Sequence, residues 1–188
     1  METWRHLEHT LETMVALVNT GTPAADSEEL PDVEAVRAFI SDRIITEVEQ
    51  PTAADLPGLY AVRSRMRAIF AAPDEATKTR LVNDALAAAT IAPRLADHDG
   101  LGVHFHFFAP YASLSEHLNT DCTMALAFLI ASGEANRLKT CQNPDCSRVM
   151  IDSSRNRSRN FCDRKSCGNR LHAAAHRERL RLARVDQT

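Results

Sequence analysis

The sequence predicts a mainly α-helical fold of the α+β class, in which a helical body with one β-hairpin precedes a small cysteine-rich unit. Three observations support this prediction. Apolar residues recur at spacings of three and four over most of residues 1–135, as on the buried face of an amphipathic helix. An Asp-Gly pair separates two short segments near residue 100. Four of the five cysteines fall after residue 140.

Helices are expected to account for most of the body. Asn19, Gly21 and Pro23 would end the first helix, Asp55 would cap the third, and Gly133 would stop the last. The expected helical ranges are residues 4–18, 33–48, 59–70, 75–90 and 113–132. Asn19 and Thr20 are the polar exception at the end of an apolar helix. They are interpreted either as a helix C-cap or as polar groups that face a ligand pocket.

The hairpin is predicted where the apolar spacing changes from helical to alternating. Its strands would cover residues 94–98 and 103–108, joined by the Asp-Gly turn. His104 and His106 alternate with Phe105 and Phe107, so the histidines share one face and the phenylalanines the other. Two histidines at this spacing could form half of a metal site, but no third ligand is evident. We therefore expect His104 and His106 to be half-exposed residues of the strand and not metal ligands.

The four C-terminal cysteines form two pairs with the spacing of metal ligands. Four residues separate Cys141 from Cys146, four separate Cys162 from Cys167, and 15 lie between the pairs. Such pairs supply the four tetrahedral ligands of a zinc ion, and four thiolates leave no open position for a catalytic water. We therefore expect one structural zinc ion. Cys122, inside the fifth helix, is instead expected to be a small core residue.

The residues around these cysteines predict a treble-clef-like zinc finger. Asn143 and Pro144 are turn formers between the first two cysteines. Residues 148–152 and 159–161 are expected to form two strands, and a long helix is expected to run from Cys167 to about residue 185. A unit of this size, with few large apolar side chains, needs the metal for its folding energy.

Charge divides the chain at the same place. Residues 1–136 contain 9 Lys and Arg and 20 Asp and Glu, which gives a net charge of −11. Residues 137–188 contain 13 Lys and Arg and 5 Asp and Glu, which gives +8. Together they give the net charge of −3 of the whole chain. We expect a helical domain over residues 1–135 and a zinc finger over residues 136–188. A basic tail behind an acidic body suggests a polyanionic partner for the tail. Alternatively, the two parts attract each other, within the chain or between subunits.

The basic residues around the cysteines predict a nucleic-acid-binding surface. Four of them recur along the last helix at spacings of 7, 4 and 3, which places them within roughly 60° of one another. Arginine binds phosphate in a bidentate manner, and the scarcity of aromatic side chains favours duplex DNA over single strands. Docking of an acidic partner, plain solvation and compensation of the zinc–thiolate charge are the alternatives. The predicted residues are Arg155, Arg157, Arg159, Arg164, Lys165, Arg170, Arg177, Arg181 and Arg184.

These segments resemble a known family. Residues 141–146 (CQNPDC), residues 151–156 (IDSSRN) and residues 167–170 (CGNR) are similar to the CGNR zinc finger. Residues 17–20 (LVNT) and the helical body resemble the ABATE domain, which precedes that finger in bacterial proteins described as stress-induced transcription regulators. Asn160 and Phe161 depart from the arginine and tryptophan that are more usual in the family.

The resemblance implies a zinc-dependent DNA-binding finger joined to a sensing or assembly domain. The implied metal ligands are Cys141, Cys146, Cys162 and Cys167. Gly168, Asn169 and Arg170 would lie at the start of a helix, where a phosphate could meet free backbone N–H groups.

We expect a transcription regulator that binds duplex DNA, with a homodimer or a small-molecule effector as possible additions. The alternative is a zinc-stabilised protein-interaction module whose body binds a partner or small ligand. We expect no enzyme, because G-x-S-x-G, H-E-x-x-H and glycine-rich phosphate loops are absent from the sequence. No apolar run reaches the roughly 18–20 residues of a membrane span, and residues 1–6 do not resemble a signal peptide. The expected compartment is the cytoplasm, where thiols stay reduced.

Overall fold

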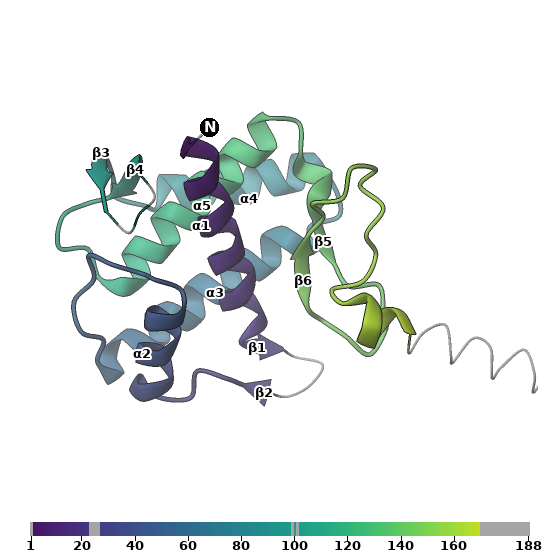
Figure 1. The fold of residues 1–188 in the computed structure, drawn as a ribbon, viewed down its shortest axis with the longest axis horizontal. Helices are drawn as coiled ribbons and strands as arrows, with labels where there is room; N and C mark the ends of the chain where they lie inside the picture. The colour runs from purple at the N-terminus through teal and green to yellow at the C-terminus, as the bar shows by residue number, and fades with distance from the viewer. Residues whose placement is uncertain (1, 23–26, 99, 101, 170–188) are drawn as a thin grey trace, which may run out of the picture.

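The computed structural model describes residues 2–22, 27–98, 100 and 102–169. These residues form the predicted helical body, hairpin and cysteine-rich finger. The hairpin, strands β3 (Ile91–Asp97) and β4 (Val103–Phe108), and the finger lie at opposite ends of the body (Figure 1). In the described part of the chain, no helix has both the length and the apolar character needed to cross a membrane.

The body is built around one central helix, α5. It contacts α1, α3, α4 and strand β4, and its Thr123 and Leu126 are fully buried. Being surrounded on most sides, it is apolar over more of its circumference than a surface helix would be. The α-helices are α1 (Glu2–Asn19), α2 (Val33–Asp42), α3 (Leu56–Ala71), α4 (Glu75–Ala87) and α5 (Leu114–Ala131), and two short 3-10 turns are η2 (Ala53–Asp55) and η3 (Ala135–Arg137).

Short polar side chains fix where these helices begin and end. The carboxylates of Asp32 and Asp74 accept backbone N–H groups at the starts of α2 and α4, and Ser113 caps α5. Asp55, the predicted cap of α3, instead accepts the N–H of Thr52 at 2.8 Å in the preceding η2 turn. Gly133 has a φ of 73° at the end of α5, which confirms the predicted glycine stop.

Helix α2 is shorter than its apolar stripe predicts. The stripe continues to residue 48, yet the helix ends at Asp42, and Ile44 is 56% exposed. Ile44 and Glu47 have φ values of 50° and 57°, which turn the chain out of the helix. The carbonyl of Arg43 accepts a hydrogen bond from the His9 ring at 2.9 Å, so packing against α1 replaces the next helical turn.

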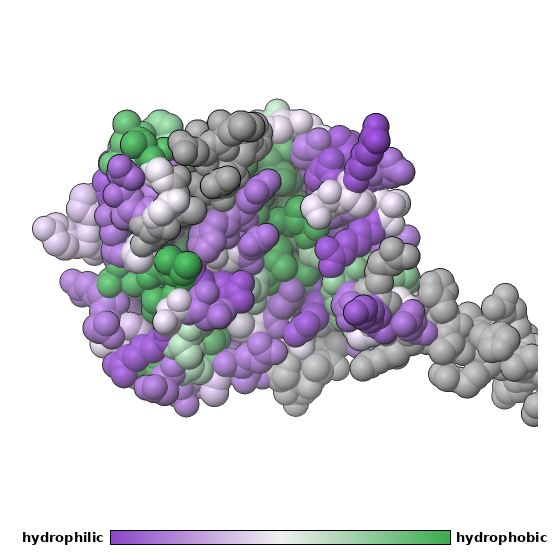
Figure 2. Space-filling view, in the orientation of Figure 1, coloured by the Kyte–Doolittle hydropathy of each residue, from purple (hydrophilic) through white to green (hydrophobic). Residues whose placement is uncertain are grey.

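The hairpin has the predicted alternation, and its histidine face is the one that meets the body. Strands β3 and β4 pair antiparallel, with a register irregularity between Ile91 and Arg94. His104 and His106 point inward and are only 2% and 4% exposed, so the expectation that they are half-exposed is wrong. The outer face is apolar and exposed, and Figure 2 shows hydrophobic side chains gathered over this hairpin. It includes Leu95, Val103 and Phe105.

The strands of the finger are not the pair that the sequence predicts. Strand β6 (Val149–Ile151) pairs with β5 (Leu138–Thr140), which precedes the first cysteine. Residues 159–161 form no strand and contribute one backbone bond, from the N–H of Gln142 to the carbonyl of Asn160 at 2.9 Å. A further ribbon, β1 (Gly21–Thr22) with β2 (Ser27–Glu28), follows α1.

The hydrophobic core continues from the body into the finger. Leu138 of β5 and Val149 of β6 are 2% and 1% exposed, and they pack in the same buried cluster as α1, α3 and α5. Strand β6 contacts α1, and β5 contacts α3. The finger is therefore seated on the body through shared apolar burial.

Candidate metal centre and nucleic-acid interface

The four cysteines of the finger converge on one point. The Sγ atom of Cys162 lies 3.7 Å from that of Cys146 and 3.6 Å from that of Cys167, and all four sulfurs lie within 4.8 Å of one another. A tetrahedral zinc ion with Zn–S bonds of about 2.3 Å separates its sulfurs by about 3.8 Å, whereas a disulfide requires about 2.05 Å. The spacing fits a closed four-cysteine zinc site and excludes disulfides among these pairs.

Asn143 connects the two cysteine turns. Its backbone carbonyl accepts the N–H of Cys146 at 2.9 Å, and its side-chain oxygen accepts the N–H of Asp145 at 3.0 Å. Its side-chain amide donates to the carbonyl of Cys167 at 3.4 Å, and the residue is 5% exposed. The sequence marked Asn143 only as a turn former. Its link to Cys167 depends on the tertiary structure.

The electrostatics of the cluster favour a bound cation. Burial raises the pKa of the Cys162 thiol, and contacts with the other three thiols raise it further. Burial acts on Cys141 in the same direction, but hydrogen bonds from the backbone N–H groups of Cys162 and Asn143 outweigh it and lower the pKa of Cys141. Four crowded thiols cannot all ionise without a compensating charge, and a divalent metal ion supplies it.

The turn that carries Cys167 is capped from within. It is a π-helical turn, η4 (Arg164–Gly168), and the Asp163 carboxylate accepts the N–H groups of Lys165 at 3.0 Å and Ser166 at 3.1 Å. The N–H of Gly168 donates to the carbonyl of Asp163 at 3.1 Å. This N–H group, expected to be free for a phosphate, is therefore already used. Asn169 is the last residue described here, and Arg170 lies outside the described residues.

Asp152 organises the turn between β6 and Cys162. Its fully buried carboxylate accepts hydrogen bonds from Lys139 Nζ at 2.6 Å and from the N–H groups of Ser154 and Arg159 at 2.9 and 2.8 Å. Burial alone would raise the pKa of Asp152, but these bonds outweigh it and hold the pKa well below its usual range. The carboxylate is therefore ionised at neutral pH.

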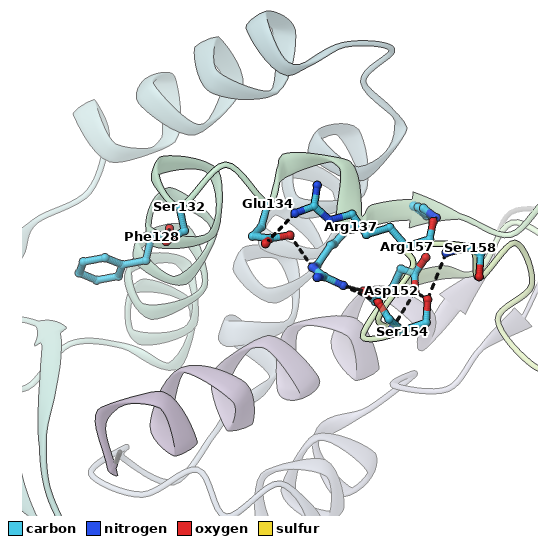
Figure 3. A network of polar contacts seen from close by, with 9 residues as sticks. Phe128, Ser132, Glu134, Arg137, Asp152, Ser154, Arg157 and Ser158 are labelled. Carbon is cyan, nitrogen blue, oxygen red and sulfur yellow. Dashed lines mark hydrogen bonds and ion pairs between the residues drawn. The ribbon is translucent and has the colours of Figure 1, made fainter.

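An arginine network joins this turn to the end of α5 (Figure 3). Arg137 donates to the carbonyls of Asp152 and Ser154 at 2.6 and 2.9 Å, and it pairs with Glu134. Arg157 pairs with the same carboxylate at 2.9 Å. Glu134, just beyond α5, thus holds two basic side chains of the finger.

The predicted nucleic-acid residues fall into three groups. Arg157 and Arg159 are engaged within the finger, since Arg159 donates to the carbonyls of Phe161 (3.0 Å) and Cys162. Arg155 and Lys165 are exposed. The Arg164 side chain lies outside the described part of the structure, as do Arg170, Arg177, Arg181 and Arg184, together with the predicted long helix.

Asn19 and Thr20, the possible pocket residues, have both side chains bound to protein atoms. The Asn19 amide donates to the carbonyl of Val149 at 3.0 Å, and its oxygen accepts the N–H of Val149 at 2.9 Å. The Thr20 hydroxyl donates to the carbonyl of Leu17 at 2.7 Å, as in the C-cap interpretation, and accepts Arg63 at 3.1 Å. Asn19 therefore fastens α1 to β6 of the finger.

Arg67 reinforces the same junction. From α3 it donates to the carbonyls of Val18 in α1 and Gly21 in β1, and to the carbonyl of Ser147 in the finger at 2.9 Å. One guanidinium thus binds carbonyl groups of both the body and the finger. Sequence reasoning missed this residue, because nothing in the pattern of α3 distinguishes it from a solvent-facing arginine.

Comparison with known protein families agrees with the geometry. Residues 137–180 match the CGNR zinc finger, the part of the chain that contains the four cysteines. Residues 11–133 match the ABATE family, whose description reads "Putative stress-induced transcription regulator". No curated protein matches the chain. The four converging cysteines are thus the zinc site of this finger, and the chain belongs to the ABATE family, with a CGNR zinc finger after the ABATE domain.

Proposed function

We propose that this protein is a zinc-dependent regulator of transcription that binds duplex DNA through the basic residues of its finger. One observation carries the proposal: the zinc site lies in a segment of net charge +8 that is seated on a body of net charge −11. Positive charge on a rigid support binds the phosphate backbone of DNA.

The internal contacts of the finger indicate which residues to test. Arg157 and Arg159 are occupied by Glu134 and by backbone carbonyls, so their replacement would damage the finger itself. Arg155 and Lys165 are exposed and can reach a phosphate without loss of an internal bond. Arg177 and Arg181 are added from the helical spacing of the sequence alone.

Salt dependence tests the proposal directly. A titration of the full chain against duplex DNA at several salt concentrations should give a linear fall of log affinity with log salt, with a slope of about −0.9 per phosphate contacted. A response that does not change with salt, or the absence of binding at low salt, would contradict DNA binding.

Charge-reversal variants identify the surface. The double variant Arg155→Glu/Lys165→Glu should make the slope less steep by about 2, since two phosphate contacts are lost. Arg177→Glu/Arg181→Glu should also weaken binding strongly. The matched control is Arg37→Glu/Arg80→Glu, which changes the charge by the same amount on exposed parts of α2 and α4. If this control weakens binding as much as the finger variants, the effect is one of net charge.

The exposed apolar face of the hairpin favours a second role in protein contact. Leu95 and Val103 are 64% and 57% exposed, and Phe105 stacks on Phe107 with 5.8 Å between ring centroids. Adjacent exposed apolar side chains are typical of protein–protein contacts, a homodimer included. Light scattering of the wild type and of Leu95→Glu tests this contact: an assembly that forms through this face should dissociate in the variant.

We propose that the protein acts by binding and not by catalysis, and that the body responds to an effector. Zinc thiolates persist where thiols stay reduced, which favours the cytoplasm as its compartment.

A further inference from the structure

The body contains a second cluster of metal-ligating side chains, far from the zinc finger. It lines a cavity of about 50 Å³ bounded by α1, the chain after α2, the hairpin and α5. His98, His104 and His106 meet there, with one ring nitrogen of each within 4.8 Å of the others. We propose that these three imidazoles bind a first-row divalent transition metal ion. His98, at the end of β3, is the third ligand that the sequence left unidentified.

The three rings are equally spaced. Each pair of ring centroids is separated by 4.9 Å, and the Nε2 atoms of His104 and His106 are 3.0 Å apart. Metal–nitrogen bonds of about 2.0–2.1 Å at a tetrahedral ion place ligand nitrogens about 3.3 Å from one another. A small rotation of either ring accommodates the difference. Imidazole nitrogens suit zinc, copper, iron and nickel.

Hydrogen bonding fixes which nitrogen of His104 faces the cluster. Its Nδ1 lies 2.7 Å from the carbonyl oxygen of Gly102. A carbonyl only accepts, so Nδ1 carries the proton, and Nε2 is directed toward His106. Metal-binding histidines commonly donate their second ring N–H to a backbone carbonyl or a carboxylate in this way.

Asp121 places a carboxylate near Nδ1 of His106, beyond hydrogen-bond distance. Its Oδ2 lies 3.9 Å from Nδ1 of His106 and 3.3 Å from Nε2 of His117. Its other oxygen accepts the N–H of Phe107 at 3.2 Å, which anchors the carboxylate to β4. The carboxylate is 9% exposed, and it would accept the Nδ1–H of His106 if metal binding at Nε2 closed the 3.9 Å gap.

A second carboxylate lies at the rim of the cluster. Glu47 Oε1 is 3.6 Å from Nε2 of His98, and its other oxygen pairs with Arg94. Glu47 is therefore placed to complete the coordination or to hold a metal-bound water. Two carboxylates near the three imidazoles, one of them paired with Arg94, supply negative charge beside the cluster, which favours a divalent cation.

The test uses the full chain and two probes, Zn²⁺ and Co²⁺. Elemental analysis after equilibration with each ion should give two equivalents per chain. In a Co²⁺ titration, the four-thiolate site should produce intense sulfur-to-cobalt charge-transfer bands. The second equivalent should add weaker visible bands with no further charge transfer, as nitrogen and oxygen ligands do. A wild type that saturates at one equivalent of both ions overturns the proposal, and the three histidines are then only hydrogen-bonded to one another.

Variants assign the second equivalent. His98→Gln, at the partly exposed rim, should abolish the second equivalent and leave the charge-transfer bands intact. Cys162→Ser should abolish the charge-transfer bands and keep the equivalent at the histidines. Asp121→Asn should weaken the second site by about 10–100-fold, as expected for a residue that orients a ligand. The matched control is His9→Gln, since His9 lines the same cavity but binds the carbonyl of Arg43. If His98→Gln is folded by circular dichroism and still binds two equivalents at wild-type affinity, the assignment is wrong.

Discussion

The side chain of Asn19 bonds to Val149 as a neighbouring strand would, donating one hydrogen bond and accepting another across a separation of 130 residues. At the last residue of α1, it satisfies the backbone N–H and C=O of a residue in β6. The alternatives considered from the sequence, a helix cap and a pocket residue, both assumed that the partner was local or a small molecule. The partner is the backbone of the finger.

Replacement of this side chain should therefore destabilise the junction. Asn19→Ala leaves the N–H and C=O of Val149 partly buried without their partner, which should lower the free energy of unfolding by about 2 kcal/mol. Urea unfolding followed by circular dichroism measures the change. Asn83→Ala, at an exposed position of α4, is the control and should stay within about 0.5 kcal/mol of the wild type. Equal effects of the two variants would argue against a special role for Asn19.

Asp152 gives the finger a stability that depends on pH. Its pKa in the folded state is depressed below the unfolded value of about 3.9, so the ionised form is favoured by folding. The contribution is present above about pH 5 and is lost as pH falls through the unfolded pKa toward the folded one.

The variant Asp152→Asn should isolate this contribution. The difference in unfolding free energy between wild type and variant should be largest near pH 7 and should shrink as pH falls below about 5. Because both proteins lose zinc in acid, only the difference is informative. Denaturant unfolding at a series of pH values measures it, and a difference that does not vary with pH would mean that the carboxylate charge is unimportant.

At the scale of elements, the part of the finger that the structure describes, up to residue 169, consists of pieces too short to persist alone. Strands β5 and β6 have three residues each, and η4 is a single turn. An isolated two-stranded hairpin is marginal even when longer. What holds these pieces together is the zinc ion, the Asp152 turn and the contact with the body.

Loss of one zinc ligand should therefore release the finger. Cys162→Ser is expected to remove the zinc equivalent of the finger, leaving at most the equivalent held by the histidine cluster, and to unfold the β5–β6 unit, as measured by elemental analysis and by proteolysis. The control is Cys122→Ala, which removes a thiol buried in α5 whose pKa is raised by burial and which should retain full zinc. A fully loaded and protease-resistant Cys162→Ser protein would contradict the ligand assignment.

At the scale of the whole molecule, the finger and the body share one core. Leu138 and Val149 bury their side chains against helices of the body, so zinc binding stabilises apolar contacts at a distance from the metal. Binding energy for a ligand that only the folded state holds adds to folding free energy. The body should therefore sense the state of the zinc site.

Zinc removal should lower the melting temperature of the whole chain. If chelation exposes Leu138 and Val149, the body loses the burial of two apolar side chains, which corresponds to roughly 10 °C in a protein of this size. Thermal unfolding of the His98→Gln chain, in which the histidine cluster should hold no metal, is followed at the helical signal with and without chelator, and added zinc should reverse the shift. A melting temperature that does not respond to the chelator would show that the body is independent of the finger.

Prediction from the sequence succeeded where local signals dominate. Cysteine spacing identified the zinc ligands, and Gly133 and the Asp-Gly turn marked a helix end and a hairpin, because each depends on residues close together in the chain. It failed where the partner is remote. The apolar stripe of α2 suggested a helix to residue 48, but contact between Arg43 and α1 ended it at Asp42. Similarly, the sequence predicted that residues 148–152 pair with residues 159–161, which follow them. In the structure β6 pairs with β5, which precedes it.

The sequence by itself determined the family, the zinc ion and its four ligands, and the opposite charges of the two parts, since these follow from residue type and spacing. The tertiary structure alone decided which face of the hairpin is buried, which arginines the finger uses internally and where Asn19 binds. Alternation places His104 and His106 on one face without saying whether that face meets the body. The pairing of β3 with β4 brings His98 beside them, and the packing of β4 against α5 buries them, because burial is a property of how elements meet.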